Sequence, residues 1–280
     1  MVNFDGRLVE VNLNTLNHSN RAFRYGDLIH EDLKVDGGTI VFWEAHYFRL
    51  MAGMRILRME IPMYFTMEYL ADEILKVVQG ATPRLVRLSV FRKNSASLVP
   101  ETHEVSFVVE VVNEMSPFYM MPKPLDEVAL FKDHYLGKGL LSQLELGQKA
   151  VEILAGIFAE ENGYDDCLLL NTDKNMVGAI TGNLFLVKDG LIKTPPLSDG
   201  AKNRVIRAQL IEILSKIEEF ELSETSISPF ELQKADELFV ASITKGIQSI
   251  GNYRKKRYET AVAERLLGLL NTKIRLSNLE

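Results

Sequence analysis

The chain has 280 residues, of which 46% are hydrophobic and 25% charged, as in an ordinary globular protein with room for two modest domains. Its formal net charge of −6 argues against the concentrated positive surface that nucleic acid requires. No apolar run approaches the ~18 residues that cross a bilayer, and the first residues lack a signal-peptide pattern. We therefore expect a cytoplasmic protein that binds neither nucleic acid nor membrane.

The first 115 residues predict a small α+β domain. Its predicted elements are a hairpin across Asp5-Gly6, a second hairpin (28–35 and 39–43) across Gly37-Gly38, a helix over 44–59 before Pro62, a helix from the cap Thr66 to 78, and strands over 85–92 and 105–112. Two prolines and little periodicity mark 116–126 as a linker.

The remaining residues, 127–280, predict a larger α/β domain, because strands and helices alternate there. The predicted elements are a helix over 148–162, a strand over 167–171, strands over 183–188 and 191–194 joined at Asp189-Gly190, a helix over 203–216, a strand over 237–242 and a helix over 258–270. The single cysteine, Cys167, lies in the apolar run CLLL and is expected to be a buried thiol. The whole chain thus predicts an α/β fold.

Motifs spread along the chain resemble those of the class IV aminotransferases, the fold-type-IV enzymes that include branched-chain aminotransferases, D-amino-acid aminotransferases and aminodeoxychorismate lyases. RAFRYGDLIHEDLKV is similar to the family segment FxYGDGVFEGxR, which places Tyr25 and His30 at the substrate pocket. EAHYFRLMAGM resembles the helix whose arginine, here Arg49, binds the cofactor phosphate. ADELFVASIT resembles the strand beside that phosphate, which implies a role there for Ser242 and Ile243.

The resemblance implies a D-amino-acid-aminotransferase-like fold, a homodimer and pyridoxal phosphate as cofactor. Such an enzyme needs a lysine that forms an imine with the cofactor aldehyde and an acid beside the pyridine nitrogen. It also needs a phosphate cup made from the amides of a helix N-terminus and an arginine. Each of the three features can be located by its motif.

All three catalytic features differ from the family pattern. In LSQLELGQKAVEILAG, Glu145 falls on the family's lysine, and in MVGAITGNLF, Gly178 falls on the pyridine acid. The cup reads Arg204-Val205-Ile206, with Arg204 on the family's small glycine. A carboxylate at position 145 cannot form an imine and repels the cofactor phosphate. We therefore expect a degenerate pyridoxal-phosphate site that does not run ordinary transamination.

Two functions follow from this pattern. The first is a non-catalytic relative that holds a small anionic ligand or acts as a dimeric binding protein. In this case Glu145 is expected to form an ion pair with Arg204 or Arg49. The alternative is an active aminotransferase or aminodeoxychorismate lyase acting on a small amino acid. That enzyme would use Lys149, four residues after Glu145, or another lysine.

Two further patterns concern metals and nucleic acid. No histidines or cysteines occur at metal-ligand spacing, so we expect no metal site. The cluster Arg254-Lys255-Lys256-Arg257 is expected to be a solvated turn before the last helix rather than a nucleic-acid contact.

Overall fold

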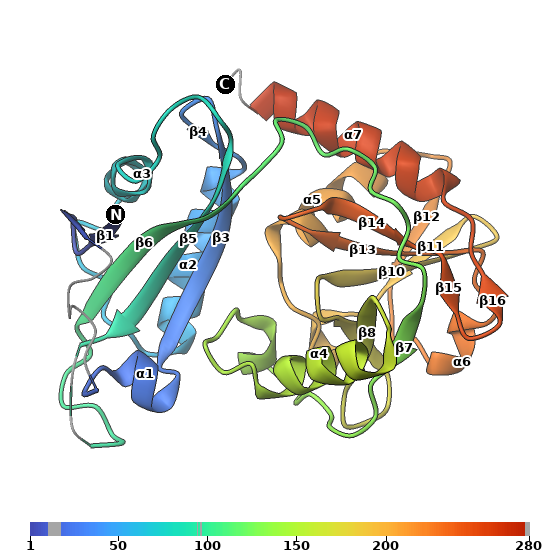
Figure 1. The fold of residues 1–280 in the computed structure, drawn as a ribbon, viewed down its shortest axis with the longest axis horizontal. Helices are drawn as coiled ribbons and strands as arrows, with labels where there is room; N and C mark the ends of the chain where they lie inside the picture. Colours follow the sequence, from blue (N-terminus) through green and yellow to red (C-terminus); the bar gives the residue numbers. More distant parts are fainter. Residues whose placement is uncertain (11–17, 94, 96, 278–280) are drawn as a thin grey trace. The chain divides into compact units, whose positions relative to one another are not determined.

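The computed structural model describes residues 1–10, 18–93, 95 and 97–277. The chain forms two compact units (Figure 1). Unit 1 contains Met1–Pro117, Glu145–Gln148 and the C-terminal end, and unit 2 contains Phe118–Leu144 and Lys149–Leu276. The segment Glu145–Gln148 is therefore part of unit 1, although its neighbours in sequence belong to unit 2. It begins with Glu145, the residue predicted to occupy the position of the family's lysine.

Unit 1 is built on an antiparallel six-stranded sheet in the order β2-β1-β6-β5-β3-β4. Its strands are β1 (Val2–Phe4), β2 (Arg7–Val9), β3 (Leu28–Asp36), β4 (Thr39–Ile40), β5 (Arg84–Arg92) and β6 (Val105–Glu114). Its helices are α1 (Arg21–Tyr25), α2 (Trp43–Ile56) and α3 (Met67–Leu75). Helix α2 runs alongside the sheet and packs on β3 (Figure 1), where Leu33, Leu50 and Met54 are completely buried.

The second hairpin differs from its prediction. Strand β4 ends at Ile40, because Phe42 adopts a left-handed φ of 54° that breaks the strand, and Trp43 already begins α2. Helix α2 also ends three residues before the predicted Met59, since Arg58 has a positive φ of 55°. The predicted cap of α3 is confirmed: the amide of Tyr69 donates to Thr66 Oγ1 at 3.1 Å.

Unit 2 contains two five-stranded sheets, in the orders β12-β11-β10-β13-β14 and β16-β15-β7-β8-β9. The strands are β7 (Val128–Leu130), β8 (Asp166–Leu170), β9 (Met176–Ala179), β10 (Asn183–Lys188), β11 (Leu191–Thr194), β12 (Glu221–Glu224), β13 (Glu237–Ser242), β14 (Gly246–Ile250), β15 (Asn252–Tyr253) and β16 (Lys256–Arg257). The helices are η1 (Leu141–Gln143), α4 (Ala150–Asn162), η2 (Leu197–Asp199), α5 (Val205–Leu214), α6 (Pro229–Leu232) and α7 (Ala261–Ser277).

The two sheets of unit 2 share one apolar core. Leu168 of β8 and Met176 of β9 belong to the same buried cluster as Leu184 of β10 and Leu238 of β13. A second cluster joins α4 to β7 and β8 and contains Cys167, whose predicted burial is confirmed. Burial raises the pKa of this thiol to about 11, so it stays protonated near neutral pH. The mixture of helices and sheets confirms the predicted α/β class.

Several predicted boundaries in unit 2 were wrong. Helix α4 begins at Ala150 rather than 148, and α7 runs from Ala261 to Ser277 rather than from 258 to 270. The predicted solvated turn is present at Arg254-Lys255, which are exposed, but Lys256 and Arg257 continue it as strand β16, paired with β15. Strands of two residues carry too little periodicity to be recognised from sequence.

The buried carboxylate of Glu237, on β13, caps the N-terminus of α7. It accepts hydrogen bonds from the amide of Val262 at 2.9 Å and from that of Ala263 at 3.1 Å, and only 3% of the residue is exposed. Because Glu237→Ala leaves these amides without an acceptor, we expect the free energy of unfolding to fall by about 2 kcal/mol in urea titrations. The matched change Glu264→Ala, on the exposed face of α7, should cost at most about 0.5 kcal/mol. Equal losses in both variants would contradict the cap.

Candidate functional site

The anchor segment of unit 1, Glu145–Gln148, is held against the start of β3 through backbone contacts. The amide of His30 donates to the carbonyl of Glu145 at 3.0 Å, and the amide of Gly147 donates to the carbonyl of Leu28 at 3.3 Å. A Cβ atom on Gly147 would lie 2.7 Å from the Leu28 side chain, so the segment approaches β3 this closely only with glycine there. Glu145 is consequently fixed in position, and 8% of it is exposed.

The same segment holds one of the two predicted pocket residues. Tyr25, the last residue of α1, accepts a hydrogen bond from Gln148 Nε2 on its carbonyl at 2.9 Å. The Arg21 guanidinium lies over the Tyr25 ring, 4.9 Å from its centroid. His30 is half-buried on β3, where its amide makes the bond to Glu145. The segment 145–148 therefore contacts both Tyr25 and His30 through backbone groups within unit 1.

A buried ion pair joins Arg49 on α2 to Glu31 on β3. Arg49 Nε lies 2.8 Å from Glu31 Oε1 and Arg49 Nη2 lies 2.6 Å from Glu31 Oε2, which is a bidentate arrangement. His46, one helical turn before Arg49, places Nδ1 at 2.8 Å from the same carboxylate. Only 1% of the Glu31 side chain and 14% of the Arg49 side chain are exposed. Arg49 thus has its carboxylate partner within unit 1.

Electrostatics at this cluster favour a charged arginine beside a neutral histidine. Burial opposes the charge of Arg49, but the attraction of Glu31 and then of Glu145 raises its pKa. Burial lowers the pKa of His46 in spite of its contact with Glu31, so the imidazole is neutral near pH 7. Arg49 contributes one positive charge, and Glu31 and Glu145 contribute one negative charge each. Glu145 also attracts Arg87, so the surroundings of this carboxylate contain charges of both signs.

The family motif identified Arg49 but not the carboxylate that holds it. Glu31 lies within the segment RAFRYGDLIHEDLKV, where an acid in the largely apolar run LIHEDLKV indicates a partner in the core. His46 and Arg49 are three residues apart on α2, so both side chains reach the same face of the helix. That spacing was the signal available in the sequence.

Four of the residues near the predicted pyridine and phosphate positions line a small hollow in unit 2. Gly178, Asn183, Lys202 and Arg204 contribute to its wall, and its volume is about 20 Å³, enough for roughly one water molecule. Asn183 Nδ2 donates to the carbonyl of Lys202 at 2.9 Å, whereas its buried Oδ1 has no partner among the described residues. A Cβ atom on Gly178 would meet the carbonyl of Gly182 at 3.0 Å. A carboxylate side chain at position 178 would therefore need a shift of its neighbours.

The predicted phosphate cup is the N-terminus of α5. Arg204 is the N-cap residue and its side chain makes no capping hydrogen bond. Val205 and Ile206 begin the helix and are buried. Arg207, the residue that follows the cup in α5, donates to the carbonyl of Pro195 at 3.0 Å and to Glu224 at 2.6 Å. Arg207 is thus committed to contacts within unit 2.

Lys149 and a second lysine lie in different settings in unit 2. Lys149 is the N-cap of α4 rather than part of its first turn, and its carbonyl accepts from the amide of Ile153 at 2.8 Å. The second is Lys202, to which no motif points. Its amine donates to the carbonyl of Leu144 at 3.0 Å and lies 3.5 Å from a Glu152 oxygen. Of these two lysines, Lys202 is the one that lines the hollow containing Gly178.

The end of strand β13 is held by polar contacts. Ser242 Oγ lies 3.0 Å from Thr244 Oγ1, and the carbonyl of Ile243 accepts from the hydroxyl of Tyr119 at 2.6 Å. Burial raises the pKa of Tyr119, so its hydroxyl keeps the proton that this bond requires. Both predicted phosphate-strand residues are therefore fixed by contacts inside unit 2.

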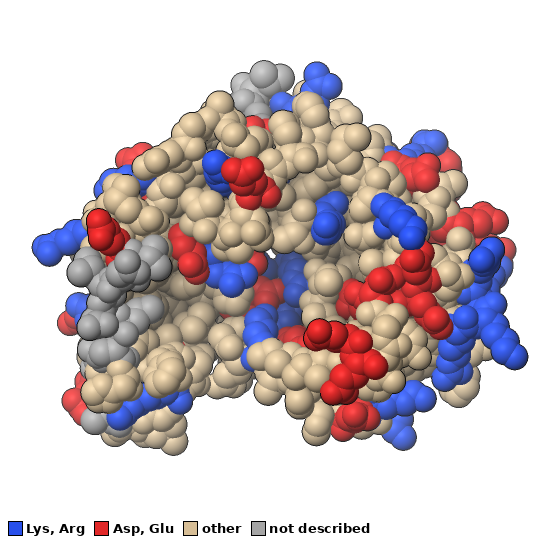
Figure 2. All heavy atoms as spheres, in the orientation of Figure 1, with Lys and Arg blue, Asp and Glu red and all other residues tan. Residues whose placement is uncertain are grey.

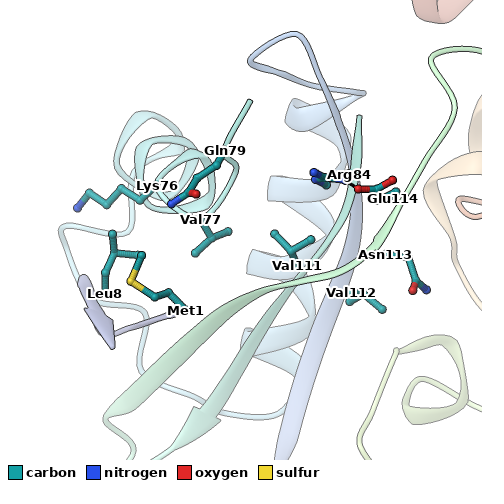
Figure 3. A pocket seen from close by; sticks show the side chains of 10 residues that line it. All are labelled: Met1, Leu8, Lys76, Val77, Gln79, Arg84, Val111, Val112, Asn113 and Glu114. Carbon is teal, nitrogen blue, oxygen red and sulfur yellow. Dashed lines mark ion pairs between the residues drawn. The ribbon is translucent and has the colours of Figure 1, made fainter. Parts of the chain in front are cut away.

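A further hollow in unit 1, of about 540 Å³, contains none of the predicted site residues (Figure 3). Met1, Leu8 and Val111 supply apolar side chains around it, while Arg84 and Glu114 form an ion pair at one end.

In the part of the chain that the structure describes, no three His, Cys, Asp or Glu side chains are grouped as metal ligands. No described helix has the length and apolar character needed to cross a membrane.

Comparisons of the sequence with a family model and with known proteins all lead to the same family. The model of the family described as Amino-transferase class IV matches residues 29–253. The chain is 24% identical to a probable branched-chain-amino-acid aminotransferase of Aquifex aeolicus, over 85% of this chain and 79% of that protein. It is 22% identical to the aminodeoxychorismate lyase of Vibrio harveyi, over 90% of this chain and 94% of that protein.

The fold is also that of solved members of the family. The branched-chain amino acid aminotransferase of Thermobaculum terrenum, solved in its PLP-form, superposes with a TM-score of 0.85 at 17% identity, covering 98% of this chain and 93% of that one. The predicted fold-type-IV architecture is therefore confirmed. The family match spans most of the chain, and its members depend on pyridoxal phosphate. The chain belongs to the class IV aminotransferase family.

Proposed function

We propose that this protein is a class IV aminotransferase relative that has lost ordinary pyridoxal-phosphate transamination and holds a small anionic ligand or acts as a binding protein. The observation that carries the proposal is the cluster around Arg49, where Glu145 acts on this arginine in addition to Glu31, the acid that the chain shares with the family segment. Glu145 stands at the position of the family's lysine and adds a second negative charge to the same cluster. A cofactor phosphate would be repelled there rather than attracted.

The residues of unit 2 support the same proposal. Gly178 supplies no acid for a pyridine nitrogen, and a side chain at this position would crowd the carbonyl of Gly182. Arg204 replaces the small residue that lets a phosphate approach the amides of the helix N-terminus. The residues of this chain therefore do not fit pyridoxal phosphate as the family pattern requires. The positive charge of Arg204 supports an anion as the remaining type of ligand.

Addition of pyridoxal phosphate to the purified protein tests the proposal. We expect no absorbance band of bound cofactor near the visible edge and, after borohydride reduction, no added cofactor mass on any lysine. A dehydrogenase-coupled transaminase assay with branched-chain amino acids should give no rate above the protein-free control. A yellow protein with one modified lysine would overturn the proposal.

The alternative is an active aminotransferase or aminodeoxychorismate lyase, and one observation favours keeping it. The amine of Lys202 lines the same hollow as Gly178, so a lysine other than the one in the family motif lies beside the former pyridine position. Against it, that amine already lies 3.5 Å from a Glu152 oxygen and donates to the carbonyl of Leu144 at 3.0 Å. Peptide mapping after reduction separates the cases, because a cofactor mass on Lys202 or Lys149 would identify the working lysine.

We also propose that the protein is a cytoplasmic homodimer, because class IV aminotransferases are usually dimeric. Light scattering after gel filtration should give twice the monomer mass of 31.7 kDa. A monomer at micromolar concentration would contradict this assignment.

A further inference from the structure

A basic hairpin forms one edge of the second sheet of unit 2. Strands β15 and β16 are joined by a turn at Arg254-Lys255, so four cationic residues follow one another from 254 to 257. Figure 2 shows Lys and Arg side chains gathered at the edge of unit 2 where Figure 1 places these two strands. The hairpin is separate in sequence from every residue predicted for the aminotransferase-type site.

The charge of this hairpin is not neutralised by ion pairs. Among the described residues, no carboxylate lies within 4 Å of any of the four cations, although many other lysines and arginines of the chain are paired. Lys256 acts only through space on Asp236. A concentrated positive region in a chain of net charge −6 therefore remains available to an anion.

Aromatic rings hold two of the cations in place. The Arg254 guanidinium lies 5.3 Å from the centroid of Tyr253, and Lys256 Nζ lies 6.0 Å from that of Tyr258. Both tyrosines are buried, and the hydroxyl of Tyr258 donates to the carbonyl of Leu232 at 2.7 Å. Rings fixed in this way restrict the cations before any ligand arrives, which lowers the entropy cost of binding.

The turn itself uses an arginine where the backbone favours glycine. Arg254 has a φ of 55°, a left-handed conformation that glycine adopts without strain and that most other residues adopt at a cost of roughly 1 kcal/mol. Short hairpin turns usually place Gly, Asn or Asp at such a position. Arg254 therefore places a guanidinium at the tip of the hairpin at a cost in backbone strain.

A groove of about 460 Å³ lies beside these cations. It is lined by Gln233, Tyr253, Arg254, Lys255 and Lys256, with no acidic residue in its wall. A second hollow of about 310 Å³, which shares Arg254 with this groove, is lined by Lys132 as well as by Glu127 and Asp133. The charge is therefore mixed beyond Arg254, and the uniformly positive region has the extent of a small molecule rather than of a nucleic-acid strand.

We propose that this groove binds a small ligand that carries clustered phosphate groups. Guanidinium and ammonium groups are the side chains that recognise phosphate oxygens, and the Gln233 amide adds a neutral donor at the groove. The bound phosphates belong either to a free polyphosphorylated molecule or to the headgroup of a lipid. A long polyanion is disfavoured, because it would extend past the groove to Glu127 and Asp133.

Calorimetric titration with tripolyphosphate at low salt tests the groove. The test variant combines Arg254→Gly with Lys255→Ser, and the matched control is Lys216→Ser, an exposed lysine elsewhere in unit 2. We expect the wild type and the control to bind alike and the double variant to lose about tenfold in affinity for each cation removed. Because glycine suits the turn, the double variant should keep its melting temperature, so lost binding would not reflect misfolding.

Two further probes identify the source of the phosphates. Flotation with vesicles containing phosphatidylinositol bisphosphate, compared with plain phosphatidylcholine vesicles, reports a headgroup, whereas binding of tripolyphosphate alone reports a free ligand. Either result, abolished in the double variant, supports the groove. The proposal is overturned if the wild type binds neither probe or if the double variant binds like the wild type. Tighter binding of a single-stranded oligonucleotide than of tripolyphosphate at this hairpin would equally overturn it.

Discussion

Replacing Glu31 with alanine should lower the free energy of unfolding by about 3–5 kcal/mol, the cost of leaving a buried ion without its partner. Arg49 donates to both oxygens of this carboxylate and His46 contacts it as well, so one substitution removes the nearest partner of both groups and leaves Glu145 as a weaker attraction for Arg49. The buried histidine cannot replace the carboxylate, because an imidazole carries no negative charge to balance that of Arg49. Urea titration followed by circular dichroism measures the change.

Asp32, the next residue on β3, provides the matched control. Its ion pair with Arg87 is also bidentate, with distances of 2.7 and 2.9 Å, but 36% of the Arg87 side chain and 26% of the Asp32 side chain are exposed. We expect Asp32→Ala to cost at most about 1 kcal/mol, because solvent and salt screen such a pair. If both substitutions cost the same, the buried cluster is not the stabilising feature of this strand.

The best predicted elements are those whose sequence alone determines both their type and their ends. Strands β10, β11 and β13 have the predicted bounds, because each is a largely apolar run ended by a turn or by a polar residue. Strand β12 was missed, since Glu221–Glu224 has no strand-like pattern and depends on parallel pairing with β11. The two-residue strand β15 likewise depends on pairing with β7, which is distant in sequence.

The candidate site was predictable as a set of positions but not as a set of interactions. The motifs gave Arg49 and Glu145, because motif spacing is a property of the sequence. The pairing of Arg49 with Glu31 depends on how α2 packs on β3, 18 residues away along the chain. No sequence pattern predicts the position of Lys202, because its contacts with Leu144 and Glu152 span 50 residues or more. Long-range ion pairs follow from packing and leave no local pattern.

Substitution of Glu145 by lysine should allow covalent attachment of pyridoxal phosphate without restoring transamination. Glu145→Lys replaces a negative charge by a positive one beside Arg49, which removes a repulsion and adds an attraction for phosphate. The described backbone bond of this residue, from His30 to its carbonyl, is independent of the side chain, so the anchor segment should keep its place. After borohydride reduction, we expect one cofactor mass on the peptide containing position 145 and none on the wild type.

Transamination by this variant should stay at least about a hundredfold below that of active relatives, because Gly178 still supplies no acid to protonate the pyridine ring. The combination of Glu145→Lys with Lys149→Ala controls for a neighbouring amine and should be labelled to the same extent. Labelling that disappears with Lys149→Ala would show that the helix lysine is the reactive one. Full activity of Glu145→Lys alone would show that Gly178 and Arg204 do not limit this site, and that a single charge reversal at the anchor separates the protein from a working enzyme.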